Sequence, residues 1–138
     1  MQDCRKYGKA PFNIAVVHGG PGAPGEMAPV ARELSADTGI LEPLQTADSI
    51  EGQITELKNV LEKSGNPPII LIGFSWGAWL SYIFAARHPA KVKKLILISS
   101  GPFEEKYVKQ ITQTRLNHLD PEDKKEALSL LSALDSGD

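Results

Sequence analysis

Short apolar runs that alternate with helix-like stretches are the feature that most restricts the fold of this chain. The runs cover Asn13–Val17, Ile69–Ile72 and Val92–Ile98, and each is followed within two residues by glycine or serine. They are apolar at consecutive positions, which is typical of parallel strands covered on both faces of a sheet. A weaker strand is predicted at Gly39–Leu44, although Pro43 is unfavourable inside a strand.

The stretches between these runs carry helical signals. Residues 27–34 have apolar positions at helical spacing, and Pro29 is compatible with a first turn. Ser49 is the predicted N-cap of a helix that ends at Gly65. Trp76–Arg87 is apolar nearly all round, which predicts a largely buried helix. Alternating strands and helices favour a parallel sheet with right-handed crossovers, so we predict an α/β fold of three layers with helices on both faces.

The character of the sequence changes after residue 102. Residues 103–119 resemble a polar helix, and Asp120-Pro121 is typical of the start of a further helix. No strand pattern follows. We therefore predict two parts, a core over residues 1–102 and a helical segment over residues 103–138.

Length, charge and cysteine content exclude several classes of protein. The 138 residues fit one domain, and a net charge of −2 argues against a general nucleic-acid binder. The single cysteine, Cys4, excludes an internal disulfide and disfavours a cysteine-based zinc site. We expect no metal and no cofactor. The apolar runs are far shorter than the ~20 residues that span a bilayer, and no apolar signal segment follows Met1. We expect a cytoplasmic protein that does not bind membranes.

The sharpest chemical signal is the pentapeptide Gly73-Phe74-Ser75-Trp76-Gly77. It is a G-x-S-x-G that directly follows one predicted strand and directly precedes a predicted helix. A serine on such a tight turn projects its hydroxyl away from the sheet, and the flanking glycines let other backbone segments pass close by. The helix start adds unpaired N–H groups and a positive dipole end. The context predicts Ser75 as a nucleophile; the plainer alternative is a glycine-rich turn with an incidental serine.

A second glycine-rich turn follows the first apolar run and has the sequence His18-Gly19-Gly20-Pro21-Gly22. The carboxyl ends of parallel strands meet at one edge of a sheet, so we expect this turn to lie close to Ser75. We predict that the N–H groups of Gly20 and Trp76 converge on one oxygen, as in the oxyanion hole of an acyl-transfer enzyme. The other four residues are predicted to shape the loop, with His18 as a brace rather than a base.

These motifs give the chain a resemblance to the N-terminal part of an α/β-hydrolase. Its two glycine turns are similar to those of proline iminopeptidase-type serine hydrolases, and the helix end and strand at residues 87–98 also resemble that superfamily. The resemblance covers about residues 12–102. It implies an incomplete α/β-hydrolase fold in which residues 103–138 begin a helical cap. It also implies hydrolysis of an ester, amide or peptide carbonyl in a small substrate through an acyl-enzyme.

The sequence departs from the superfamily pattern after Ser75, because there the acid and the histidine follow later strands. We expect His88 at the opposite edge of the sheet, His118 in a polar helix, and Glu104 and Glu105 in a charged first turn. None of these four is predicted to complete a triad; His118 as a stand-in base is the alternative. A serine hydroxyl is a weak nucleophile without a neighbouring base, so we expect this chain alone to be nearly inactive.

The last apolar run and the glycine loop support two further expectations. Val92–Ile98 is predicted to form an edge strand with charge only at Lys93 and Lys94, which favours self-association through that edge or, as the alternative, through the terminal helices. The apolar Phe74 and Trp76 beside the serine suit an apolar acyl group. The alternative to an enzyme is a non-catalytic α/β module that binds a small anion or a protein partner at the loop over residues 19–25.

Overall fold

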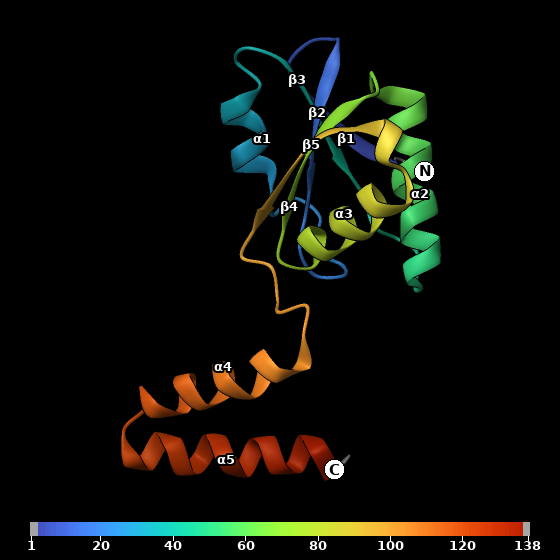
Figure 1. Cartoon of the computed structure of the whole chain (residues 1–138). Helices are drawn as coiled ribbons and strands as arrows, with labels where there is room; N and C mark the ends of the chain where they lie inside the picture. Colours follow the sequence, from blue (N-terminus) through green and yellow to red (C-terminus); the bar gives the residue numbers. More distant parts are fainter. Residues whose placement is uncertain (1–2, 137–138) are drawn as a thin grey trace. The chain divides into compact units, whose positions relative to one another are not determined.

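The computed structural model describes residues 3–136, and the chain divides after Gly101 into two compact units (Figure 1). The first unit is built on a five-stranded sheet with the order β1-β3-β2-β4-β5. The strands are β1 (Cys4–Tyr7), β2 (Phe12–Val17), β3 (Gly39–Pro43), β4 (Ile69–Phe74) and β5 (Val92–Ile98). The four strands expected from the sequence are confirmed, and β5 lies at one edge of the sheet as predicted.

Strand β1 was missing from the sequence prediction, which expected an all-parallel sheet. It runs antiparallel to β3, with Arg5 opposite Glu42, whereas the other pairs of strands are parallel. Two of its four residues are basic, so it lacks the continuous apolar run by which the other strands were recognised. Pro43 is accommodated because the pairing of β3 with β2 ends at Leu41, before the proline.

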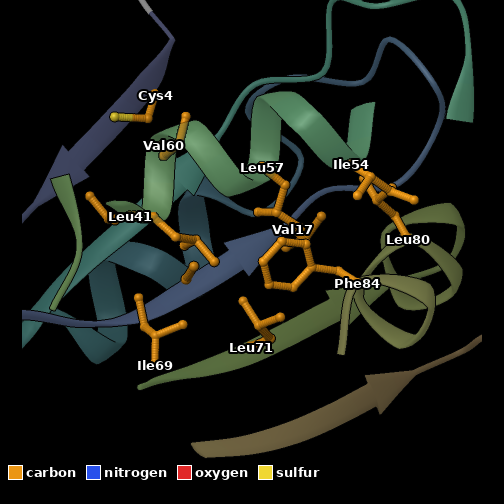
Figure 2. Close-up of a cluster of buried hydrophobic side chains, with 12 residues drawn as sticks. Cys4, Val17, Leu41, Ile54, Leu57, Val60, Ile69, Leu71, Leu80 and Phe84 are labelled. Atoms are coloured by element: carbon orange, nitrogen blue, oxygen red, sulfur yellow. The ribbon is translucent and has the colours of Figure 1, made fainter. Parts of the chain in front are cut away.

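Helices cover both faces of the sheet, which confirms the three-layer architecture. The helices of this unit are α1 (Ala28–Leu34), α2 (Ile50–Ser64) and α3 (Trp76–Arg87), followed by the 3-10 turn Pro89–Lys91. Figure 2 shows the larger core, where Val17 and Leu71 of the sheet contact Leu57 of α2 and Phe84 of α3. On the opposite face, α1 closes a smaller core of strand and helix residues, namely Val16, Ile40, Ile72, Met27 and Ala31.

Local signals for the helix ends are confirmed, whereas the predicted burial of α3 is only partly right. The Ser49 side chain accepts a hydrogen bond from the Gly52 amide at 3.2 Å and caps α2. Gly65 follows the last turn of that helix. In α3 one face is buried, but Tyr82 on the other face is 49% exposed. An almost wholly apolar helix therefore still keeps a solvent-facing side.

The second unit consists of α4 (Glu105–Asn117) and α5 (Pro121–Ser136). Asp120 caps α5, because its Oδ1 accepts hydrogen bonds from the amides of Glu122 and Asp123 at 3.0 Å each. Leu116 is the buried residue of α4. That this unit begins a helical cap is an interpretation that we retain as a proposal. In the described part of the chain, no helix has the length and apolar character needed to cross a membrane.

Candidate active site

Ser75 stands on a sharp turn between β4 and α3. Its φ of 53° and ψ of −118° are a combination that residues with a side chain rarely adopt. Strand β4 lies beside β2 in parallel, with Gly73 opposite Val17, so the turns after these strands leave the sheet next to each other. The strand order also reverses here, since β3 follows β2 on one side and β4 lies on the other. Such a switch point is where open α/β sheets bind ligands.

The two glycines that flank Ser75 are required by close packing. A Cβ on Gly73 would lie 2.7 Å from Ala78 Cα and would collide with the carbonyl of Gly77. A Cβ on Gly77 would lie 2.5 Å from the carbonyl oxygen of His18 and would also collide with Val17. The atoms that block both positions belong to the main chain, so they could not move aside at low energetic cost. The glycines of the G-x-S-x-G motif thus permit the turn to close over the end of β2.

The backbone of Ser75 is anchored, whereas its hydroxyl does not cap the helix. The Ser75 amide donates a hydrogen bond to the carbonyl oxygen of Ile98 at 3.0 Å, and its own carbonyl accepts one from the Ala78 amide at 3.0 Å. The side chain makes no capping hydrogen bond with α3 and is half-buried. This arrangement keeps the hydroxyl available at the start of a helix, where a developing negative charge is stabilised.

The glycine-rich turn after β2 reaches the serine, as predicted from strand order. An ideal Cβ on Gly19 would lie 3.2 Å from Ser75 Cβ. Gly20 follows with a φ of 98°, a conformation that glycine adopts without strain. Trp76 opens α3, and amides in the first turn of a helix have no partner within the helix. The roles of Gly20 and Trp76 as oxyanion donors stay a prediction.

His18 is fully buried at the base of this turn. Its Nδ1 lies 2.8 Å from the carbonyl oxygen of Gly19, so Nδ1 carries the proton, while Nε2 is buried without a hydrogen-bond partner. The His18 carbonyl accepts a hydrogen bond from Gln45 Nε2 at 2.8 Å. These contacts fit the predicted brace, and no hydrogen bond joins Ser75 to a histidine within residues 3–136.

The other candidate acids and bases occupy other places. His88 follows α3 at the end away from Ser75, with its ring 4.9 Å from that of Phe84. His118 follows α4 in the second unit and its Nδ1 lies 2.8 Å from the carbonyl oxygen of Thr114. Glu104 precedes α4 and pairs with Lys106 at 2.6 Å, and Glu105 opens that helix. Across residues 3–136 no group of three His, Cys, Asp or Glu side chains could hold a metal ion.

Two tryptophans form a wall beside Ser75. Trp76 and Trp79 have ring centroids 6.1 Å apart, and with Ser75 and Gly101 they line a shallow hollow of about 230 Å³. Trp79 Nε1 donates to the carbonyl oxygen of Gly101 at 3.0 Å. Trp79 was not among the residues predicted for the site, although its spacing of three from Trp76 places both on one side of a helix.

The orientation of Trp76 depends on a buried glutamine that the sequence analysis also missed. Trp76 Nε1 donates to Gln53 Oε1 at 2.8 Å, and Gln53 Nε2 donates to the carbonyl oxygen of Ala47 at 3.0 Å. Gln53 lies in α2 and is 4% exposed. Both indole N–H groups are therefore satisfied by the protein, and the rings offer the hollow only apolar surface.

The segment after β3 is held in place by a carboxylate of α2. Glu56 accepts hydrogen bonds from the amides of Thr46 and Ala47 at 3.0 and 3.2 Å and from the Thr46 hydroxyl. Burial favours a higher pKa for Glu56, but these hydrogen bonds outweigh it and lower the pKa below its usual value. The carboxylate is charged at neutral pH and fixes the segment that receives Gln53.

Comparison with known proteins identifies the fold family of this chain. A family model described as alpha/beta hydrolase fold matches residues 46–125. Epoxide hydrolase 4 of Homo sapiens is 37% identical over 46 residues, which are 33% of this chain and 13% of that protein. The crystal structure of VinJ is similar to this chain, with a TM-score of 0.81 and 22% sequence identity. The match covers 98% of this chain and 52% of VinJ. The thioesterase domain from the curacin biosynthetic pathway has a TM-score of 0.64 and 25% sequence identity. That match covers 80% of this chain and 46% of the thioesterase domain. The chain thus spans about half the length of these two structures.

Proposed function

This chain belongs to the alpha/beta hydrolase fold family, and on that premise we propose that it forms the nucleophile-bearing part of a serine hydrolase. In the proposed reaction Ser75 attacks the carbonyl carbon of an ester or amide. The leaving group departs with a proton, the acyl group stays on Ser75 as an ester, and water then cleaves that ester. The observation that carries the proposal is the positive φ of Ser75 on the strand-to-helix turn, closed in by Gly73 and Gly77.

The negative oxygen that forms during the attack needs hydrogen-bond donors. We assign this role to the amides of Gly20 and Trp76, which belong to the two turns that meet at Ser75. Loss of one such donor typically costs about 3–4 kcal/mol in the transition state. The start of α3 adds the positive end of the helix dipole.

Carbonyl chemistry suits a serine better than epoxide chemistry does. A serine that opened an epoxide would leave an alkyl ether on the protein, which water does not readily cleave. A serine that attacks a carbonyl leaves an ester, which water can cleave to restore the hydroxyl. The name epoxide hydrolase among the relatives therefore does not set the substrate expected here.

The tryptophan wall supports an apolar group on the substrate. The rings of Trp76 and Trp79 border the hollow next to Ser75, and neither presents a free N–H to it. Phe74, which the sequence also suggested for this role, packs against the core on the α1 side of the sheet and next to Gly19, rather than lining the hollow. Carboxylic esters with an apolar acyl group are the first substrates to test, and peptide amides of the proline iminopeptidase type are the narrower form of the proposal.

A proton acceptor for Ser75 is the further requirement of the reaction. We propose that a segment outside residues 3–136, or a second polypeptide, supplies it. Without that base, preorganised donors and binding alone leave a residual acceleration of about 10³–10⁴ over water. We therefore propose that the 138-residue chain reacts slowly with acylating reagents and turns over substrate poorly.

Covalent labelling tests the nucleophile. The protein is exposed to a fluorophosphonate probe for hours, and the modified peptide is identified by mass spectrometry. We expect an adduct on Ser75 that is lost in Ser75→Ala and kept in Ser49→Ala, which alters the serine at the start of another helix. Absence of the adduct in folded protein would refute the nucleophile, and heat released by an anionic nucleotide in calorimetry would then favour a binding module.

A further inference from the structure

A fully buried carboxylate lies beneath the glycine loop and has no part in the chemistry described so far. Glu42 lies in β3, and its side chain is 0% exposed. Its Oε2 accepts a hydrogen bond from the Tyr7 hydroxyl at 2.8 Å and lies 3.5 Å from Arg5 Nη1. Its Oε1 accepts a hydrogen bond from the amide of Gly25 at 2.8 Å.

The two oxygens of Glu42 face different parts of the molecule. Oε2 contacts two side chains of β1, those of Arg5 and Tyr7. Oε1 accepts a hydrogen bond from a backbone amide of the loop between β2 and α1. A buried carboxylate is costly unless donors satisfy it, so this loop contact contributes to keeping the charge in place. The carboxylate thus ties the loop to the sheet.

Gly25 is fitted closely to this anchor. It has a φ of 94°, and an ideal Cβ on it would lie 2.6 Å from Arg5 Nη1. The next residue, Glu26, accepts a hydrogen bond from the amide of Gly19 at 2.9 Å. Gly19 in turn lies against Ser75. A continuous series of contacts therefore runs from the buried carboxylate to the proposed nucleophile.

We propose that Glu42 is a positioning residue, which fixes Gly25 and, through Glu26, holds the turn at Gly19 and Gly20 in register with Ser75. The inference rests on the proposed function, in which the Gly20 amide stabilises the oxyanion. Glu42 itself touches neither Ser75 nor the oxyanion. Its contribution is to limit the movement of the loop that does.

Three variants of the whole chain separate positioning from simple stability. Glu42→Gln keeps an oxygen that can accept from the Gly25 amide, whereas Glu42→Ala removes it. Glu62→Ala removes a surface carboxylate that pairs with Lys91 at 2.6 Å and serves as the matched control. Each is reacted with the fluorophosphonate, the rate of modification of Ser75 is measured, and the rate is divided by the folded fraction from urea unfolding.

We expect Glu42→Ala to react about 10–100-fold more slowly, because small displacements of a catalytic group can cost about 10²-fold in rate. Glu42→Gln and the control should stay within about threefold of the wild type, since the acceptor for Gly25 is retained or untouched. A wild-type rate in folded Glu42→Ala, or an equal loss in Glu42→Ala and Glu42→Gln, would overturn the proposal.

Two additions keep the test decisive. If Glu42→Ala does not fold, Gly25→Ala puts a side chain on a backbone with a φ of 94° and so strains the loop at its contact with the intact carboxylate; slow labelling supports the proposal and wild-type labelling overturns it. If Ser75 of the wild type is never modified, the proposed function fails by itself. Hydrogen exchange of the Gly19 and Gly20 amides then decides the positioning role: faster exchange in Glu42→Ala than in Glu42→Gln supports it, and equal exchange overturns it.

Discussion

Gly77, in the first turn of α3, lies directly against the main-chain carbonyl of Val17 at the end of β2, with no space for a methyl group between them. The contact joins the turn that carries Ser75 to the strand that leads into the glycine-rich loop. Both parts of the proposed site are therefore positioned by one backbone contact, and the contact can be tested.

Gly77→Ala is expected to destabilise the protein by about 1–3 kcal/mol, because an added methyl group must displace backbone atoms. Urea unfolding measures the change. Ala86→Gly, at an exposed position of the same helix, is the comparison, and its cost should be about 1 kcal/mol from backbone freedom alone. A Gly77→Ala protein as stable as the wild type would contradict the contact.

Gln53→Leu is expected to cost about 1–3 kcal/mol, because the part-buried Trp76 Nε1 and the Ala47 carbonyl would each lose a hydrogen-bond partner. Urea unfolding followed by tryptophan fluorescence reports the stability and the shared environment of Trp76 and Trp79. Gln113→Leu removes a surface amide that bonds to Asn117, and it should change stability by less than about 0.5 kcal/mol. Equal losses of stability in Gln53→Leu and Gln113→Leu would contradict a specific contribution of the Gln53 hydrogen bonds.

Trp79→Ala is expected to weaken the preference for longer acyl groups. Each CH₂ buried against the tryptophan wall is worth about 0.8 kcal/mol, or about fourfold in rate. The rates of Ser75 acylation by p-nitrophenyl acetate and hexanoate give the preference directly. Trp79→Phe should keep most of it, and Tyr82→Ala, an exposed aromatic of the same helix outside the hollow, should leave it unchanged. If Trp79→Ala and the wild type showed the same preference for hexanoate over acetate, the tryptophan wall would not bind the acyl group.

Tyr7→Phe is expected to change how stability depends on alkaline pH. Burial, followed by the hydrogen bond to Glu42, raises the pKa of Tyr7 above its ordinary value of about 10. The folded state therefore favours the protonated phenol, so its stabilising contribution is complete below pH about 10 and is lost as the pH rises through the folded pKa. The stability of the wild type should approach that of Tyr7→Phe over this range. If the stabilities of the wild type and Tyr7→Phe, measured by urea unfolding, changed in parallel with pH, the raised pKa of Tyr7 would be contradicted.

Self-association through β5 is the interaction that we propose for the core. This strand lies at the edge of the sheet, and Ile96, Leu97 and Ile98 are each 38–39% exposed. Ile96→Lys places a charge on the edge and should lower the mass measured by light scattering toward that of a monomer. Leu134→Lys, on an exposed side chain of α5, should not change it. The opposite pattern would assign the association to the helices, and a wild-type monomer at high concentration would dismiss it.

The sequence was sufficient for those parts of the fold that are encoded by local pattern. The apolar runs located β2, β4 and β5 because strands buried on both faces need no polar positions. Ser49 and Asp120 marked helix starts because their side chains satisfy free amides. Strand β1 was missed because an edge strand with one exposed face mixes charged and apolar residues.

The contacts around the site could not be predicted because they join distant segments. Gln53 reaches Trp76 from another helix, and Glu42 of β3 accepts a hydrogen bond from Gly25 in the loop between β2 and α1. In the sequence a glutamine in an amphipathic helix and a glutamate before a proline are typical of solvated positions. Only the packing of α2 and of the loop onto the sheet buries them and gives each a specific partner.

The hydrogen bond from the Ser75 amide to the Ile98 carbonyl makes the outermost strand part of the support of the nucleophile. We propose that a second copy paired with the exposed edge of β5 would change that support. By thermodynamic linkage, occupancy of the strand and binding of a carbonyl analogue at Ser75 must then alter each other's affinity by the same factor. The affinity of the Ser75 site for a carbonyl analogue would therefore depend on protein concentration, as it does on pH or temperature.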